Sequence, residues 1–145
     1  MTAMHETARV HFGVAHPWLC DSMGHLTSRH YVAMFDDASY HFFRMVFGYD
    51  AAAETWSGLG FADVRQVIEY KSEVSSGDLV HIDGEIARLG EKSIVARFTM
   101  RRSSDDAEVA TLEATTVFFD LVARRARALT DEMRQRGARW AAASA

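Results

Sequence analysis

The sequence has little of what marks a secreted, membrane-spanning or nucleic-acid-binding protein. It contains one cysteine, Cys20, which leaves no partner for an internal disulfide. The apolar runs are far shorter than the roughly 20 residues that cross a bilayer, and the N-terminus lacks the basic and apolar segments of a signal peptide. The net charge of −4 argues against a nucleic-acid binder, which needs a basic face. We therefore expect a cytoplasmic protein without membrane or nucleic-acid partners.

Proline and glycine are both absent between Ser28 and Phe47, a segment with helical periodicity. Apolar residues recur there at three- and four-residue steps, the period of one helix face; they are Tyr31, Met34, Phe35, Ala38, Phe42, Met45 and Val46. Ser28 can cap the start of this helix and Gly48 can close its end. Twenty residues form a rod of about 30 Å, as long as a small domain is wide.

The rest of the chain is typical of strands, with side chains alternating between two faces. Val10, Phe12 and Val14 share one face of a predicted strand at residues 8–16, and further strands are predicted at 61–74, 79–88, 93–102 and 107–121. A helical turn is expected near residues 51–56 and a short helix near 130–140. The four later strands are joined by short turns, which favours an antiparallel meander. At 145 residues, the chain is predicted to be one α+β domain, 1–145, with its sheet curled round the long helix.

A polar turn at residues 21–26, DSMGHL, precedes the long helix, and Tyr31 follows six residues after His25. Together with the aromatic helix ending at Gly48, and with a Gly77-Asp78 turn, this pattern resembles the hotdog-fold acyl-CoA thioesterases of the 4-hydroxybenzoyl-CoA thioesterase family. The resemblance covers roughly residues 8 to 130. It implies hydrolysis of a coenzyme A thioester in a site between two subunits, and hence a homodimer or homotetramer.

The resemblance also implies roles for individual residues of the turn. Asp21 would be the catalytic carboxylate, and a backbone N–H near Ser28 would hold the thioester oxygen. Members of the family often carry Asn at or beside Ser28 and a small residue before the tyrosine. In this chain Arg29 and His30 precede Tyr31. This difference from the family pattern bears on which acyl group the protein accepts.

The chemistry of the residues agrees with that implication. A helix N-terminus offers unpaired N–H groups and the positive end of the helix dipole. Donors placed where an oxyanion develops contribute about 3–4 kcal/mol to lowering the barrier. A carboxylate such as Asp21 can attack a thioester directly or activate water, and the sequence does not choose between the two. No metal or other cofactor is needed, since coenzyme A is part of the substrate.

Each candidate catalytic residue also has a structural alternative. Asp21 could serve only to cap the turn. His25 could orient the carboxylate or the substrate, or could be a hydrogen-bonded structural residue. Asp36, in the helix beside Asp37, is a second candidate for a catalytic acid. Cys20 is more typical of a small buried residue than of a nucleophile, and the histidines match no strong metal-binding pattern.

The predicted substrate-binding residues combine an aromatic wall with one base. Aromatic walls accept aryl groups, short acyl chains or cations. Several arginines and Lys71 could instead meet the phosphates of coenzyme A, or could simply lie on solvated strand faces. The substrate-binding residues predicted from the sequence are Trp18, Met23, Gly24, Tyr31, Phe61 and Arg65.

Two other functions remain open from the sequence. One is a hotdog-fold hydratase or dehydratase that acts on enoyl-CoA. That chemistry usually shows an Asp and a His with Asn-Pro between them, which residues 21–25 lack. The other is a non-catalytic protein that binds acyl-CoA without turning it over.

Overall fold

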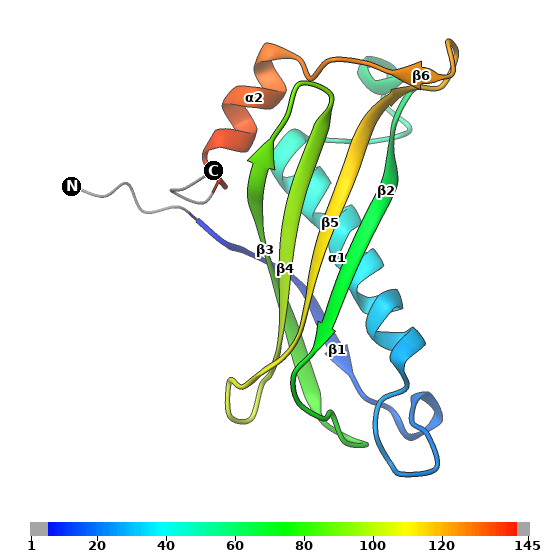
Figure 1. Ribbon diagram of the computed structural model, residues 1–145, viewed down its shortest axis with the longest axis vertical. Helices are drawn as coiled ribbons and strands as arrows, with labels where there is room; N and C mark the ends of the chain where they lie inside the picture. The colour runs from blue at the N-terminus through cyan, green and yellow to red at the C-terminus, as the bar shows by residue number, and fades with distance from the viewer. Residues whose placement is uncertain (1–5, 142–145) are drawn as a thin grey trace, which may run out of the picture.

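A curled antiparallel sheet holds one long helix against its inner face in the computed structural model, which describes residues 6–141 (Figure 1). The sheet has five main strands in the order β1-β3-β4-β5-β2, and a two-residue strand, β6 (Arg125–Ala126), pairs with β5. The main strands are β1 (Ala8–Val14), β2 (Leu59–Tyr70), β3 (Leu79–Leu89), β4 (Ser93–Arg102) and β5 (Glu108–Asp120). The helices are α1 (Ser28–Phe47) and α2 (Asp131–Ala138), with 3₁₀ turns at Pro17–Leu19 and Glu54–Trp56. The predicted hotdog fold is confirmed.

Helix α1 has the bounds that its periodicity predicts, but its start differs in detail. The N-cap is Thr27 rather than Ser28, and the Thr27 side chain makes no capping hydrogen bond. At the other end Gly48 adopts a left-handed conformation, with φ of 69°, and its N–H donates to the carbonyl of Arg44. The first turn of α1 therefore lacks the side-chain acceptor that a capping serine or threonine normally supplies.

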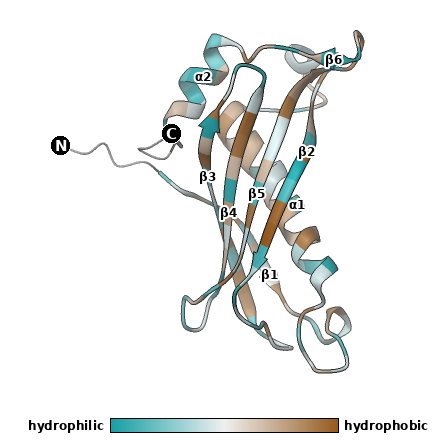
Figure 2. Ribbon diagram, in the orientation of Figure 1, coloured by the Kyte–Doolittle hydropathy of each residue, from teal (hydrophilic) through white to brown (hydrophobic). Residues whose placement is uncertain are grey.

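The core lies between α1 and the inner face of the sheet. Phe42 of α1 packs edge-to-face on Phe98 of β4, with ring centroids 5.4 Å apart. Beneath them, Gly84 of β3 leaves the space that the rings occupy, because a Cβ there would lie 2.9 Å from Phe98 Cε1. Figure 2 shows hydrophobic and hydrophilic residues alternating along the strands, as the predicted half-buried sheet requires.

Strand β1 departs from the predicted alternation. Its pairing with β3 shifts between Arg9 and His11, which makes Val10 an extra residue in a β-bulge. One extra residue reverses the side-chain alternation beyond it. Val10 is therefore buried, whereas Phe12 is 75% exposed and Val14 is 36% exposed. The prediction that these three side chains share one face is wrong for this reason.

Strands β1 and β2 form the two edges of the main sheet. Strand β2 is the longer edge, and its pairing with β5 shifts at Val64, between Asp63 and Arg65. Val64 and Tyr70 on this strand are 62% and 51% exposed. A long edge strand with exposed apolar side chains favours pairing with another chain.

No helix within residues 6–141 has the length and apolar character needed to cross a membrane.

Candidate active site

The polar turn predicted to carry the chemistry is a tight loop ahead of α1, held by several hydrogen bonds within it. The N–H of Asp21 donates to the carbonyl of His25 (2.9 Å), and the N–H of Gly24 donates to the carbonyl of Asp21 (3.0 Å). The Asp21 carboxylate turns back over the loop, where its Oδ1 accepts the N–H groups of Met23 (2.9 Å) and His25 (3.2 Å). Gly24 takes a left-handed conformation, with φ of 78°, which closes the turn. One carboxylate oxygen is thus held by backbone.

Neighbouring segments tie this turn down on both sides. The N–H of Thr27 donates to the carbonyl of Leu19 at 3.0 Å, which joins the start of α1 to the segment before the turn. The N–H of Leu26 donates to the carbonyl of Val74 at 2.7 Å, which joins the turn to the segment between β2 and β3. Asp21 is exposed, but its backbone is anchored to two other parts of the chain.

The first turn of α1 presents unpaired donors beside this loop. Among residues 6–141, no protein acceptor meets the N–H groups of Ser28 and Arg29, whereas the N–H of His30 donates to the carbonyl of Thr27. The first turn contains no acidic residue. Arg29 and His30 add basic groups where a helix normally favours acidic ones. The positive end of α1 is therefore not neutralised by the residues of its own first turn.

His25 and Cys20 lie at the turn but direct their side chains elsewhere. The His25 imidazole Nε2 lies 3.2 Å from Glu73 Oε2, so His25 meets Asp21 through its backbone. The Cys20 thiol is partly buried and donates to the carbonyl of His16, with 3.4 Å between the sulfur and the oxygen. Both arrangements stabilise the loop.

Of the aromatic residues predicted to bind substrate, Trp18 lies in the open beside the turn. It is 74% exposed and stacks on His16 with the ring centroids 4.3 Å apart, while Met23 at the tip of the turn is 72% exposed. Tyr31 is different, because it is only 5% exposed and packs edge-to-face on Tyr70. Burial raises the pKa of the Tyr31 phenol. In the single subunit, Trp18 and Met23 are open to a ligand and Tyr31 supports α1 from within.

Phe61 does not lie at the turn. It lines a small hollow farther along α1. It stacks on Phe43 with the ring centroids 4.8 Å apart. The hollow has a volume of about 140 Å³ and holds the carboxylates of Asp36 and Asp63. Asp36 is eight residues beyond the first residue of α1, which corresponds to about 12 Å along the helix axis.

Asp63 is a candidate functional residue that the sequence analysis missed. Its Oδ1 accepts a hydrogen bond of 2.6 Å from the hydroxyl of Thr116, which is itself 2% exposed. The available signal was its spacing of two residues from Phe61, which places a charged group on the face of β2 that meets the core. The bulge at Val64 then reverses the alternation for the rest of the strand.

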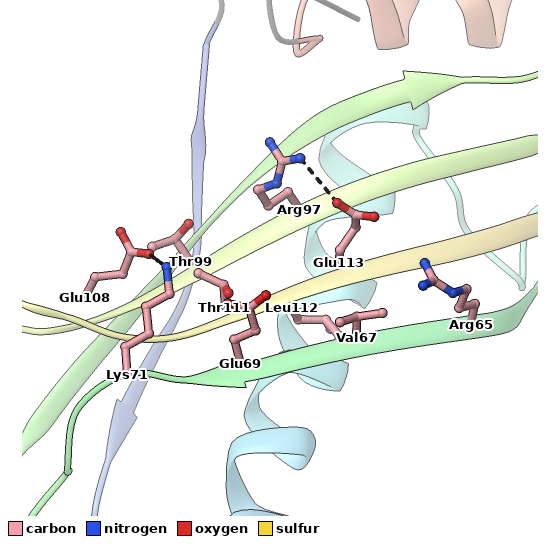
Figure 3. A pocket seen from close by; sticks show the side chains of 10 residues that line it. All are labelled: Arg65, Val67, Glu69, Lys71, Arg97, Thr99, Glu108, Thr111, Leu112 and Glu113. Carbon is pink, nitrogen blue, oxygen red and sulfur yellow. Dashed lines mark hydrogen bonds and ion pairs between the residues drawn. The ribbon is translucent and has the colours of Figure 1, made fainter.

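Arg65 lies on the face of the sheet that points away from α1 (Figure 3). It lines a charged hollow of about 490 Å³ on that face. In the same hollow, Lys71 pairs with Glu108 at 2.6 Å and Arg97 pairs with Glu113 at 3.3 Å. Arg65 has no acidic partner in the described part of the chain. Within one subunit the structure does not bring Arg65 together with Asp21.

The histidines that the structure describes do not converge on a metal site. Within residues 6–141, no three His, Cys, Asp or Glu side chains are placed to share a metal ion.

The family follows from a sequence match. The family model described as the thioesterase-like superfamily matches residues 14–137. The chain belongs to this superfamily. No curated protein matches the chain.

Solved structures of similar proteins agree with this superfamily fold. A hypothetical protein from Staphylococcus aureus, solved in complex with CoA, is 18% identical with a TM-score of 0.81, over 97% of this chain and 87% of that one. A probable thioesterase from Escherichia coli is 20% identical with a TM-score of 0.75, over 94% and 98%. A 1,4-dihydroxy-2-naphthoyl-CoA thioesterase from Synechocystis is 11% identical with a TM-score of 0.77, over 92% and 96%. At these identities the likeness shows the shared fold.

Proposed function

We propose that this member of the thioesterase-like superfamily hydrolyses an acyl-CoA thioester to a free acid and coenzyme A. The observation that carries the proposal is the placement of Asp21, whose carboxylate is fixed by two backbone N–H groups in the loop that leads directly into α1. Within the described part of the chain, the N–H groups of Ser28 and Arg29 have no acceptor, which leaves them available to a ligand. A carboxylate and an oxyanion-binding helix N-terminus are the two elements that thioester hydrolysis requires.

The thioester oxygen is expected to accept a hydrogen bond from the N–H of Ser28. Negative charge builds on this oxygen when the carbonyl carbon becomes tetrahedral, so a donor that is already in place stabilises the transition state more than the ground state. The positive end of α1 adds to this stabilisation. The side chain of Ser28 is not needed for the contact.

The Asp21 carboxylate then has two chemically balanced routes. As a base it removes a proton from water, the resulting hydroxide attacks the carbonyl carbon, the C–S bond breaks, and the proton goes to the coenzyme A thiolate. As a nucleophile it forms a mixed anhydride and expels the coenzyme A thiolate; water then hydrolyses the anhydride, which releases the free acid, regenerates the Asp21 carboxylate and supplies the proton that the thiolate takes up. His25 is expected to help through its backbone N–H on Asp21, because its imidazole is paired with Glu73.

A second subunit is expected to complete the substrate site. Trp18 and Met23 are largely exposed beside the catalytic loop. The long edge strand β2 carries Val64 and Tyr70 in exposed positions. Pairing of two β2 edges would cover these apolar groups and extend the sheet. We therefore propose a homodimer, or a homotetramer built from it, with Arg65 of the β2 edge kept as a candidate for the coenzyme A phosphates.

Coenzyme A as the carrier has support from a structural relative, because the Staphylococcus aureus protein was solved in complex with CoA. The test is thiol release from a panel of acyl-CoA esters, read with a thiol-reactive dye. The panel should include acetyl, long-chain, benzoyl and phenylacetyl esters, and enoyl-CoA followed by its ultraviolet absorbance. Release of thiol from at least one ester is the expected result. Loss of enoyl absorbance without thiol release would support a hydratase, and binding without any turnover would support an acyl-CoA carrier.

A further inference from the structure

The segment between β2 and β3, residues 71–78, packs behind the polar turn. We call it the backing segment. It lies at one end of the molecule, between the polar turn and the turn that joins β4 to β5 (Figure 1). The carbonyl of Val74 accepts the N–H of Leu26 at 2.7 Å. The N–H of Ser76 donates to the carbonyl of Gly24 at 2.9 Å. The position of the polar turn therefore depends on where the backing segment is held.

The backing segment also contacts the start of α1. The phenol of Tyr31 meets the backbone of Val74, and this contact opposes the rise that burial causes in the pKa of Tyr31. The side chain of Glu73 reaches the polar turn, with 3.2 Å between its Oε2 and Nε2 of His25. Two neighbouring residues of the backing segment thus contact both parts of the proposed site, the turn that carries Asp21 and the helix start that presents N–H groups.

An arginine at the end of β4 holds the backing segment from the other side. Arg102 donates from Nη1 to the carbonyl of Glu73 and from Nη2 to the hydroxyl of Ser72, the latter at 3.5 Å. Its Nε and Nη2 also donate to the two carboxylate oxygens of Asp105, each at 3.1 Å. The Arg102 side chain is 20% exposed. It therefore joins the turn between β4 and β5 to the segment that supports the polar turn.

The ion pair with Asp105 does not by itself account for an arginine at this position. The Asp105 side chain is 52% exposed, and exposed ion pairs contribute little to stability. A lysine could form that pair as well. An arginine adds a planar fork whose donors point in two directions, so that it holds a carboxylate on one edge and a backbone carbonyl on the other. The fork, rather than the charge, makes the contact with the carbonyl of Glu73.

We propose that Arg102 is a positioning residue for the Asp21 carboxylate and that it acts through the backing segment, without contacting substrate. The inference rests on the proposed hydrolysis by Asp21 and names a further residue on which that reaction depends. The Asp21 carboxylate is bound to backbone N–H groups of its own turn, so a shift of the turn moves the carboxylate with it. A misplacement of about 1 Å costs about a hundredfold in rate. Loss of the Arg102 fork should therefore lower kcat and leave KM nearly unchanged.

The test compares Arg102→Lys with Arg101→Lys on the best ester of the panel. Arg101 is the adjacent residue of β4, and its partners, Glu108 at 3.7 Å and the carbonyl of Asp106 at 3.2 Å, lie outside the backing segment. Arg102→Lys should lower kcat at least about tenfold and change KM less than about twofold, whereas Arg101→Lys should change neither. Asp105→Asn loosens the guanidinium without removing it, and it replaces Arg102→Lys if that variant does not fold.

A double-variant cycle separates positioning from a general loss of structure. If Arg102 acts through Asp21, Arg102→Lys lowers kcat in the wild-type background but has little further effect in Asp21→Asn, where the carboxylate is already absent. Equal fold-losses in the two backgrounds would overturn the inference and leave the proposed hydrolysis intact. An unchanged kcat in folded Arg102→Lys, or equal losses in Arg102→Lys and Arg101→Lys, would overturn it as well.

Hydrogen exchange followed by mass spectrometry tests the same contact without any activity. Peptides that span residues 21–27 and 71–76 should exchange at least about fivefold faster in Arg102→Lys than in wild type, and at an unchanged rate in Arg101→Lys. If no ester is hydrolysed, or if Asp21→Asn keeps full activity, the proposed hydrolysis fails and this result still decides the inference. Faster exchange confined to these peptides supports a positioning contact, and unchanged exchange overturns it.

Discussion

Replacing Gly24 by alanine should weaken the turn that holds Asp21, and the structure defines the cost in free energy of unfolding. Gly24 has φ of 78°, and a Cβ added there meets no atom within 4 Å, so the only penalty is backbone strain. A residue with a Cβ loses about 1–2 kcal/mol in the left-handed region. Alanine regains roughly 0.4–1 kcal/mol because it restricts the unfolded chain. The net expectation is a loss of roughly 1 kcal/mol in the free energy of unfolding.

Urea unfolding followed by tryptophan fluorescence measures this loss. With a slope of about 2 kcal/mol per molar urea, the midpoint should fall by roughly 0.5 M. The control is Gly77→Ala, because Gly77 has φ of 90° and equally open space for a Cβ. Both variants should lose similar stability. Only Gly24→Ala should also lower kcat for thioester hydrolysis, because the two N–H groups that hold the Asp21 carboxylate flank residue 24.

Two results would refute this reasoning. An unchanged urea midpoint in Gly24→Ala would mean that the left-handed turn is not required. Equal loss of kcat in Gly24→Ala and Gly77→Ala would mean that activity follows general stability rather than the position of Asp21.

Three further perturbations test the core, the acidic hollow and the edge strand. Gly84→Ala should cost about 1–3 kcal/mol in urea unfolding, because its Cβ would press on the buried ring of Phe98 at 2.9 Å; a loss below about 0.5 kcal/mol would contradict the close packing of helix and sheet. Asp36→Asn should raise the melting temperature at pH 7 but not near pH 3, because burial, and then the charges of Asp63 and Asp37, raise the pKa of Asp36 and make its ionised form the costly one above that pKa; an equal rise at both pH values would contradict this cost of ionising Asp36. Val64→Lys should give a smaller molar mass in size-exclusion chromatography with light scattering, because it places a charge in the proposed interface between β2 edges. An unchanged molar mass would mean that the interface does not involve β2.

Much of the fold follows from local patterns in the sequence. Helix α1 is predictable because its apolar period, its lack of proline and glycine, and the glycine at position 48 all indicate the same element. The alternation of side chains in strand β1 is harder to predict. The bulge at Val10 depends on the pairing of β1 with β3, and β3 lies some 70 residues away in the sequence. The wrong prediction for Phe12 follows directly from that long-range pairing.

The candidate site, like the fold, has one part that local sequence predicts and another part that depends on long-range contacts. The turn that holds Asp21 is local, so residue spacing and a family resemblance predict it, and the catalytic role of Asp21 stays a prediction. The hollow is not local, because Asp36 and Asp63 come from a helix and an edge strand that meet only in the folded chain. Phe61 was predicted as a substrate-binding residue, but its position in this hollow rather than beside Asp21 required the tertiary structure. Arg65 points to the outer face for the same reason (Figure 3).

The most direct measurement of the central claim is the steady-state rate of thiol release by wild type and Asp21→Asn on the best ester of the panel. The asparagine side chain keeps an oxygen that accepts the N–H groups of Met23 and His25, so the turn and the urea midpoint should be nearly unchanged. The account predicts a fall in kcat of at least about 100-fold, the scale of a positioned acid–base group. Activity retained in a folded Asp21→Asn protein would contradict it and would leave Asp21 as a residue that only shapes the turn.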